Sequence, residues 1–170
     1  VSLGGAIIFS ADDVDRMVHG QGICLTDGTS DRTTRLREID PGPGGASPGD
    51  FTRVGARALF TAAAPETGSE PRTSDGTPAG TVLVADVLPG GSGGVRGDLI
   101  AFRDGVIFRA ENARSGDEPF FSDGTSAGTR LLADVLPGAR DSSPILLPGA
   151  TWARHDTFVF AARSPDDALF

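Results

Sequence analysis

The stretch GDEPFFSDGTSAGTRLLADVLPG at residues 116–138 has a close counterpart 48 positions earlier, GSEPRTSDGTPAGTVLVADVLPG at residues 68–90. The two stretches are identical at 17 of 23 positions. A more diverged third copy keeps Gly20, Asp27-Gly28-Thr29, Thr33 and Pro41-Gly42 at the same offsets. Self-similarity at a fixed period of this length indicates a protein built from stacked repeats.

One repeat unit is predicted to form four short strands. In the copy that holds residues 116–138, two apolar runs at 99–103 and 106–110 flank Asp104-Gly105, a pair that favours a hairpin turn. A polar loop at 111–117 precedes a third strand at 119–122, and a turn at 123–128 leads into a fourth strand at 129–136. That turn has glycine at two places that can take positive φ angles, Gly124 and Gly128.

The expected fold class is therefore all-β, a β-propeller-type repeat with about three and a half four-stranded antiparallel blades of about 48 residues. Residues 1–170 are predicted to be one repeat domain, with copies at about 1–50, 51–98 and 99–146 and a partial copy at 147–170. Glycine-rich stretches at 42–49 and 90–97 are expected to connect the blades. One phenylalanine recurs in each copy at spacings of 51, 48 and 52, which implies small loop insertions: Phe9, Phe60, Phe108 and Phe160.

Composition narrows the function classes. Glycine and proline make up 36 of the 170 residues, and 38% of the chain is hydrophobic, which is typical of a turn-rich folded protein. The net charge is −8 without a strong basic cluster, so a nucleic-acid partner is not expected. No apolar run approaches the length of a membrane span. The single cysteine, Cys24, excludes an internal disulfide and a multi-cysteine zinc site.

The repeat resembles the ELWxxDGT repeat family, which is named for a Glu-Leu-Trp-x-x-Asp-Gly-Thr core followed by Gly-Thr, an acidic residue and Pro-Gly. The resemblance covers essentially the whole chain and rests on residues 70–77 and 118–125 together with the trailing motifs: Gly80-Thr81, Asp86, Pro89-Gly90, Gly128-Thr129, Asp134 and Pro137-Gly138. The late Ser-Pro pair also recurs, as Ser47-Pro48 and Ser143-Pro144.

This resemblance implies propeller-like repeats in secreted or surface-exposed bacterial proteins, mostly without an assigned activity. The chain departs from the family at the Leu-Trp pair, which is replaced by Pro71-Arg72, Pro119-Phe120 and Ile23-Cys24. The packing partner of the family's tryptophan must therefore be rebuilt here. The resemblance supplies no catalytic residues.

Carboxylates at equivalent positions of the repeats are the first candidates for chemistry. An aspartate opens each Asp-Gly-Thr turn, and an acidic residue follows eleven positions later, giving the pairs Asp27 and Glu38, Asp75 and Asp86, and Asp123 and Asp134. Hard oxygen ligands suit calcium, so one hypothesis is a calcium ligand in each blade. The alternative, which we favour, is a turn carboxylate that accepts backbone N–H bonds, because a turn is needed in every repeat and a catalytic site only once.

Other candidates carry weaker signals. His19 and His155 are isolated and read as solvated turn residues, and the single tryptophan, Trp152, is expected to be buried between blades. An enzyme alternative, a hydrolase that acts on glycans, would need an acidic pair, and several carboxylates qualify by type alone. They are Asp12, Asp13, Asp15, Glu111, Asp166 and Asp167.

A propeller closes with about four to eight blades, so three and a half leave an exposed sheet edge at about 157–170. We therefore expect a fragment or a subunit of a larger closed assembly, in which a protein partner or a second copy covers that edge. The expected function is a non-enzymatic binding or structural module, with a glycan as a further possible ligand, in an extracellular, cell-surface or periplasmic setting. One alternative is a structural subunit of a multi-protein complex without its own ligand, and the other is the glycan-acting hydrolase.

Overall fold

The computed structural model describes residues 1–12, 20–146 and 157–163. Within these ranges the chain forms four separate antiparallel sheets, three of four strands and one of two, and a single 3-10 turn, η1 (Ser30–Arg32). The all-β prediction is confirmed, and no α-helix occurs in the described part of the chain. None of its segments forms a helix that is long and apolar enough to cross a bilayer.

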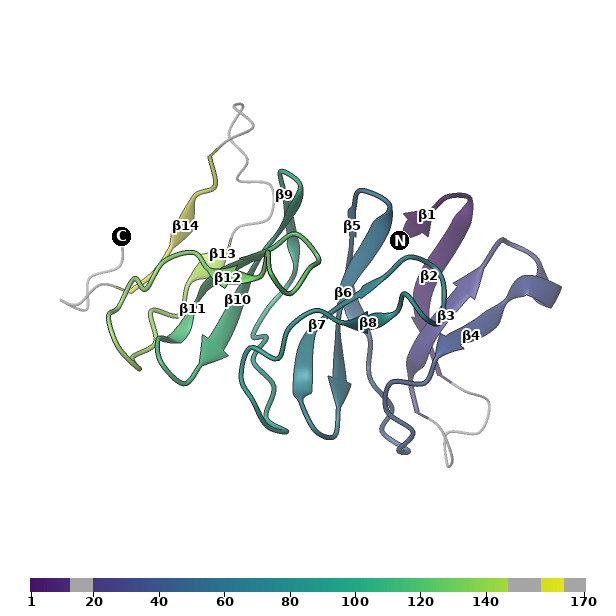
Figure 1. Cartoon of the computed structure of the whole chain (residues 1–170), viewed down its shortest axis with the longest axis horizontal. Helices are drawn as coiled ribbons and strands as arrows, with labels where there is room; N and C mark the ends of the chain where they lie inside the picture. The colour runs from purple at the N-terminus through teal and green to yellow at the C-terminus, as the bar shows by residue number, and fades with distance from the viewer. Residues whose placement is uncertain (13–19, 147–156, 164–170) are drawn as a thin grey trace.

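Each four-stranded sheet is an up-and-down meander, because its strands lie side by side in chain order (Figure 1). The first sheet contains β1 (Ser2–Leu3), β2 (Ala6–Ala11), β3 (Gly22–Thr26) and β4 (Thr34–Arg37). The second contains β5 (Gly49–Val54), β6 (Arg57–Ala64), β7 (Gly68–Ser74) and β8 (Val82–Leu83). The third contains β9 (Ile100–Phe102), β10 (Gly105–Asn112), β11 (Gly116–Ser122) and β12 (Arg130–Leu131), and the fourth pairs β13 (Ile145–Leu146) with β14 (Phe160–Ala161).

The strand register follows the sequence repeat. The recurring phenylalanine lies on the second strand of each four-stranded sheet, where Phe9 is opposite Cys24, Phe60 is opposite Arg72 and Phe108 is opposite Phe120. The first copy has three more residues than the other two between its phenylalanine and its Asp-Gly-Thr turn, and the extra length falls between β2 and β3. Equivalent residues therefore occupy equivalent places, and differences between copies can be compared position by position.

The fourth strand of the unit is much shorter than predicted. A strand over residues 129–136 was expected, whereas β12 spans only Arg130–Leu131 and residues 132–144 run as turns and irregular chain to β13. The reason is that Glu118 on β11 accepts hydrogen bonds from the N–H groups of Val135 and Leu136, at 3.2 and 3.3 Å, and so turns this segment beneath its own sheet. Backbone groups bound to a side chain cannot extend a strand ladder.

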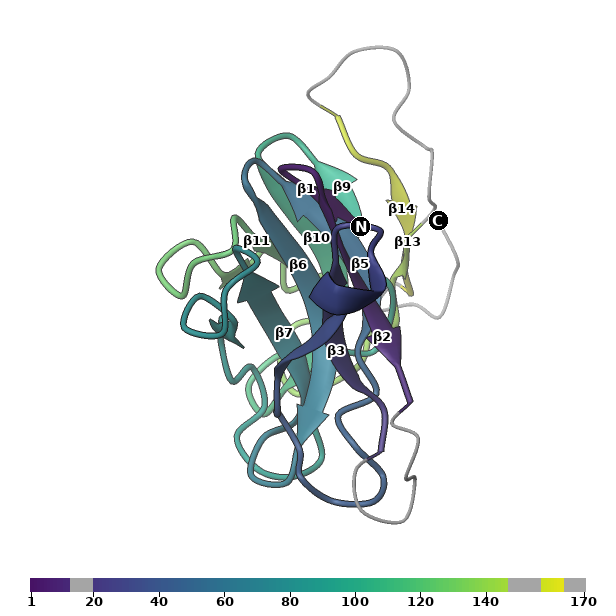
Figure 2. The ribbon, with the colours of Figure 1, turned by 90° about the vertical axis from the view of Figure 1, so that its right-hand side faces the viewer.

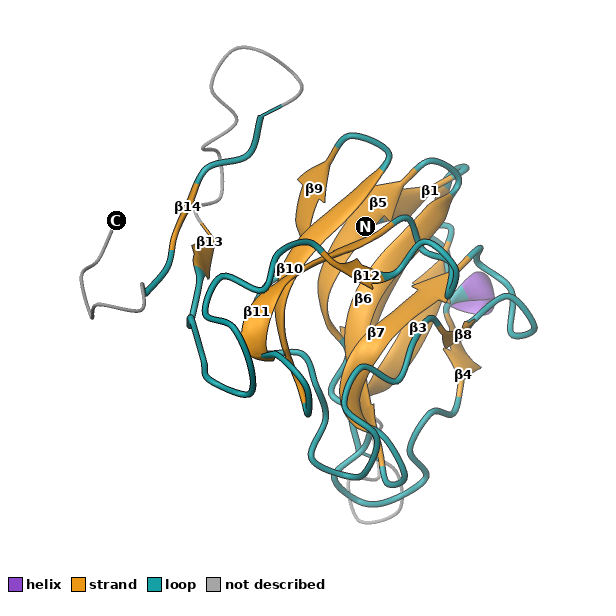
Figure 3. Ribbon diagram, turned by 60° about the vertical axis from the view of Figure 1, so that its left-hand side comes forward, coloured by secondary structure: helices purple, strands orange, loops and turns teal. Residues whose placement is uncertain are grey.

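Side chains on the second strand of a sheet point alternately to its two faces, so the middle sheet packs on both of its neighbours. On β6, Ala58, Phe60 and Ala62 join a core with the first sheet, whereas Leu59 joins a core with the third. This is the period-two pattern of a strand that is buried on both faces. Figures 2 and 3 show the sheets standing one behind another, with β5 and β9 on one side and β7 and β11 on the other.

The glycine-rich stretches connect successive sheets, as predicted. Residues 84–99 link β8 to β9, and inside this connector the N–H of Arg96 donates to Arg109 and the N–H of Glu111 donates to Gly94. Near its end, the hydroxyl of Thr52 on β5 donates to the carbonyl of Leu99 at 2.8 Å. The connector therefore adds an extended edge to the next sheet and joins it to the one before.

Candidate functional site

Each Asp-Gly-Thr turn is closed by its own side chains. In the second copy, Asp75 Oδ1 accepts the N–H of Thr77 at 2.9 Å and its hydroxyl at 2.7 Å. The Thr77 hydroxyl in turn accepts the N–H of Gly80 at 3.0 Å. The hydroxyl of Thr81 donates to the Thr77 carbonyl at 2.7 Å, which ties the end of the turn to its middle. These bonds are the local turn-stabilising pattern that the favoured reading expects.

The third copy repeats all of these bonds, and the first copy repeats those made by the aspartate and by the later threonine, Thr33, with Arg32 at the position of Gly80. Asp123 Oδ1 accepts the N–H and hydroxyl of Thr125 at 2.8 and 2.7 Å, and Asp27 Oδ1 accepts those of Thr29 at 3.1 and 2.7 Å. In all three, the hydrogen bond from the threonine hydroxyl is the main cause that lowers the pKa of the aspartate below its usual value. The carboxylates are therefore ionised acceptors that hold a turn.

The two glycines of the turn have different roles. Gly124 has a φ of 89° and Gly76 one of 90°, as expected for a left-handed position. Gly128, by contrast, is not among the positive-φ glycines of the described residues. A Cβ on Gly128 would instead collide with the carboxylate of Asp123, and one on Gly80 with that of Asp75. In these two copies the aspartate carboxylate leaves no room for a side chain at this position, whereas the first copy has Arg32 there.

The second members of the acidic pairs lie elsewhere. Glu38 accepts a hydrogen bond from the Arg35 guanidinium at 3.0 Å, and Asp86 and Asp134 are exposed. Across the described residues, no group of three or more histidine, cysteine or acidic side chains is placed to hold a metal ion. Calcium binding by these pairs stays a prediction without a preformed cage in support.

Two buried glutamates hold the connectors between sheets, and sequence reasoning missed their role. Glu70 on β7 is fully buried, and its carboxylate accepts the N–H groups of Gly94, Val87 and Leu88 at 2.6, 3.1 and 3.2 Å. Burial raises the pKa of Glu70, and the nearby negative charge of Asp86 adds to that rise, whereas the hydrogen bonds from the three backbone N–H groups oppose it. The bonds compensate the carboxylate for the water it has lost.

The equivalent Glu118 on β11 is also fully buried and accepts the hydroxyl of Ser142 at 2.6 Å in addition to two backbone N–H groups. The first copy has Gly22 at this position, and a Cβ there would collide with the guanidinium of Arg35. The signal was present in the sequence, because a glutamate recurs at a fixed offset ahead of two of the three Asp-Gly-Thr turns. The sequence pattern alone did not predict that this glutamate would be buried.

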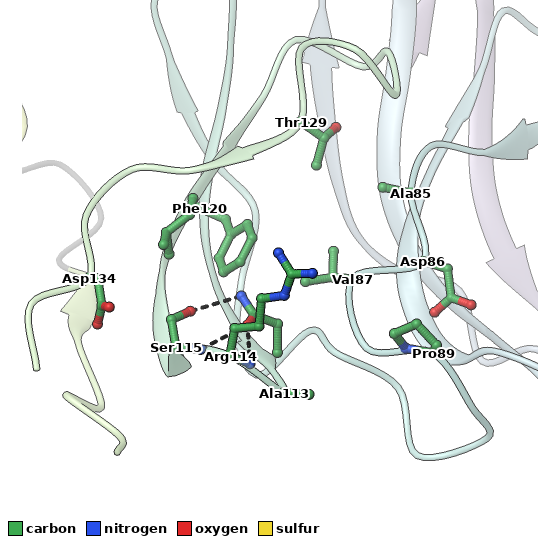
Figure 4. Close-up of a pocket in the computed structure, with 12 residues that line it drawn as sticks. Ala85, Asp86, Val87, Pro89, Ala113, Arg114, Ser115, Phe120, Thr129 and Asp134 are labelled. Atoms are coloured by element: carbon green, nitrogen blue, oxygen red, sulfur yellow. Dashed lines mark hydrogen bonds between the residues drawn. The ribbon is translucent and has the colours of Figure 1, made fainter. Parts of the chain in front are cut away.

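A pocket of about 610 Å³, here called the seam pocket, opens between the second and third sheets (Figure 4). Its apolar walls come from Val87 and Pro89 of the connector and from Phe120 and Leu131 of the third sheet. Its charged lining residues are Asp86, Asp134 and Arg114, and in Figure 4 the two carboxylates stand on opposite sides of the pocket. The remaining lining residues are small or polar: Ala85, Asn112, Ala113, Ser115 and Thr129.

The loop that carries Arg114 has a fixed backbone. Asn112 Oδ1 accepts the N–H groups of Arg114 and Ser115 at 2.8 and 2.9 Å, and Asn112 Nδ2 donates to the Ser115 hydroxyl at 2.8 Å. The Arg114 side chain is exposed and points into the space between Phe120 and Val87. The pocket thus combines an apolar floor with charges of both signs.

The remaining candidate residues do not come together in one site within the described part of the chain. Glu111 pairs with Arg96 at the surface, and Cys24 is a partly buried residue of β3. His19, His155, Trp152, Asp13, Asp15, Asp166 and Asp167 lie outside the described residues. Comparison with known protein families, with curated proteins and with solved structures found no match.

Proposed function

We propose that the chain is a β-propeller-type repeat module with a binding or structural role in a secreted or cell-surface bacterial protein. One observation carries the proposal: three consecutive four-stranded meanders share a register, a turn and a packing mode. The first strands β5 and β9 contact each other, which is the arrangement expected when blades converge on their inner strands. The secreted or surface setting rests on the resemblance to the ELWxxDGT repeat family.

Exposed apolar side chains on the outer faces of the first and last sheets favour a partner that covers these faces. Phe60 and Phe108 are fully buried between sheets, whereas the equivalent Phe9 is only partly buried and its face neighbour Ile7 is 49% exposed. At the other end, Ile145 on β13 is 54% exposed. Apolar groups at such positions indicate contact with another blade or protein.

Light scattering on the 17.4 kDa chain tests the proposal. We expect a mass above that of one chain that falls on dilution, and we expect Ile7→Asp and Ile145→Asp to reduce the association. Val82→Asp is the matched control, because Val82 is 39% exposed but lies on the middle sheet. A folded wild type that stays at the mass of one chain at all concentrations would refute the need for a covering partner.

A further inference from the structure

One arginine crosses the seam between the first and second sheets. Arg37 is the last residue of β4, and its Nη1 donates to the carbonyl of Thr81 at 2.7 Å and to that of Pro78 at 3.2 Å. Both carbonyls belong to the end of the Asp-Gly-Thr turn of the second copy. The first seam is therefore bridged by a guanidinium group bound to two backbone oxygens.

The second seam has backbone carbonyls at the equivalent sequence positions but lacks the arginine. The residue 48 positions after Arg37 is Ala85, and the residues 48 positions after Pro78 and Thr81 are Ser126 and Thr129. Ala85 and Thr129 both line the seam pocket. The pocket therefore lies where the preceding seam holds an arginine side chain.

The walls of the seam pocket fit the rest of an arginine side chain. Val87 and Leu131 can cover the three methylene groups, and the ring of Phe120 offers a face on which a flat guanidinium stacks. Asp86 and Asp134 place negative charge on the two sides of the opening. The net charge of −8 further favours a cationic ligand.

We propose that the seam pocket binds an arginine side chain from an extended segment of a partner protein, in the position that Arg37 occupies one repeat earlier. The inference names the partner chemistry for the proposed binding role and rests on that role. A peptide is the preferred source, because its neutral backbone can lie along an acidic rim. Free arginine would bring its own carboxylate toward Asp86 and Asp134.

Arg114 competes with the ligand. Its exposed side chain points into the pocket and carries the same charge as the incoming group. The equivalent residue of the second copy, at the seam that Arg37 fills, is Glu66. Removal of the Arg114 charge is therefore expected to strengthen binding, which an anionic ligand would not show.

Calorimetric titration with the blocked peptide acetyl-Gly-Arg-Gly-amide tests the inference. Peptides that replace arginine with citrulline, a neutral group of the same shape, or with lysine are the ligand controls. We expect the citrulline peptide to bind at least tenfold more weakly, because it loses charge-assisted hydrogen bonding and the attraction to Asp86 and Asp134. Free arginine should bind several-fold more weakly than the blocked peptide.

Substitutions in the seam pocket should change the affinity for the arginine peptide in opposite directions. Ala85→Arg should fill the site from within and abolish binding, while Ala133→Arg, the same change at the equivalent exposed position of the next copy, should leave it unchanged. Asp86→Asn should weaken binding about threefold, and Arg114→Ser should strengthen it by a similar factor. Thermal melts of each variant verify that the fold is intact.

The inference is overturned by equal binding of the arginine and citrulline peptides, by undiminished binding to a folded Ala85→Arg variant, or by weaker binding to Arg114→Ser. It also fails if neither the wild type nor Arg114→Ser binds the arginine peptide. Light scattering reports separately on the covering of the end sheets, so failure of the pocket and failure of the proposed module can be told apart.

Discussion

Replacement of Glu70 by alanine should release the connector between the second and third sheets. The change leaves the N–H groups of Val87, Leu88 and Gly94 without the acceptor they share in the folded protein. An unsatisfied buried donor costs about 1–3 kcal/mol, so three of them cost at least about 3 kcal/mol. Gly94 is buried, whereas Val87 and Leu88 are only half-buried and can be partly hydrated once freed, so we expect a loss of about 3–5 kcal/mol.

Glutamine at position 70 should cost less. Glu70 Oε1 accepts from Leu88 and Gly94, and Oε2 accepts from Val87. Glutamine keeps one acceptor oxygen but places an NH₂ group against a remaining donor, which predicts a loss of about 1–3 kcal/mol. The order wild type, glutamine, alanine follows from the number of bonds retained.

Urea unfolding monitored by circular dichroism measures these losses, and amide hydrogen exchange locates them. The exchange protection of Val87, Leu88 and Gly94 should fall in both variants, while that of β10 should change less. Glu66→Ala is the matched control, because Glu66 is exposed on the preceding loop, and it should remain within about 0.5 kcal/mol of the wild type. A Glu70→Ala variant as stable as this control would refute the role assigned to the buried carboxylate.

Three further predictions concern the Asp-Gly-Thr turns. Gly80→Ala should lower the melting temperature, because its Cβ would collide with the Asp75 carboxylate, whereas Gly44→Ala, in open space, should not; equal melting temperatures would contradict the steric argument. The Thr77 hydroxyl lowers the folded-state pKa of Asp75, so its contribution is present above about pH 3.8 and is lost as the pH falls through the folded pKa. The stability difference between wild type and Thr77→Val in urea should therefore shrink on acidification to about pH 2, and a constant difference would oppose this linkage. Chelation of calcium should leave the melting temperature unchanged, and a clear rise on adding calcium would instead support the calcium hypothesis.

The sequence was sufficient to predict the strands whose signals are local. The hairpin at Asp104-Gly105, the strand around Phe108 and the connector at 90–97 follow from turn chemistry and apolar runs, and the structure contains all three. The fourth strand at 129–136 was predicted too long, because its apolar residues satisfied the propensity rules for strands. A single long-range contact, from Glu118 to Val135 and Leu136, redirects that segment.

The same difference between local and long-range contacts decides which features of the candidate site could be predicted. The role of Asp75 in its turn could be predicted because the partner, Thr77, is two residues away. The bridge from Arg37 to Thr81 and the burial of Glu70 could not, because both depend on how one sheet lies against the next. The seam pocket arises from Ala85 in one copy and Arg37 in the other, a difference that gains meaning only after the two seams are compared.

Phe60 packs against the first sheet, and Phe108 packs against the second sheet. The recurring phenylalanine thus always faces the preceding sheet, so the packing has the same direction along the chain. Each of these sheets therefore packs on a surface that the preceding sheet supplies. Duplication of a whole 48-residue block would therefore preserve both packing faces of every sheet, whereas a deletion that removes part of a sheet would leave two surfaces that do not match. Growth of such a protein over evolutionary time is thereby restricted to whole steps.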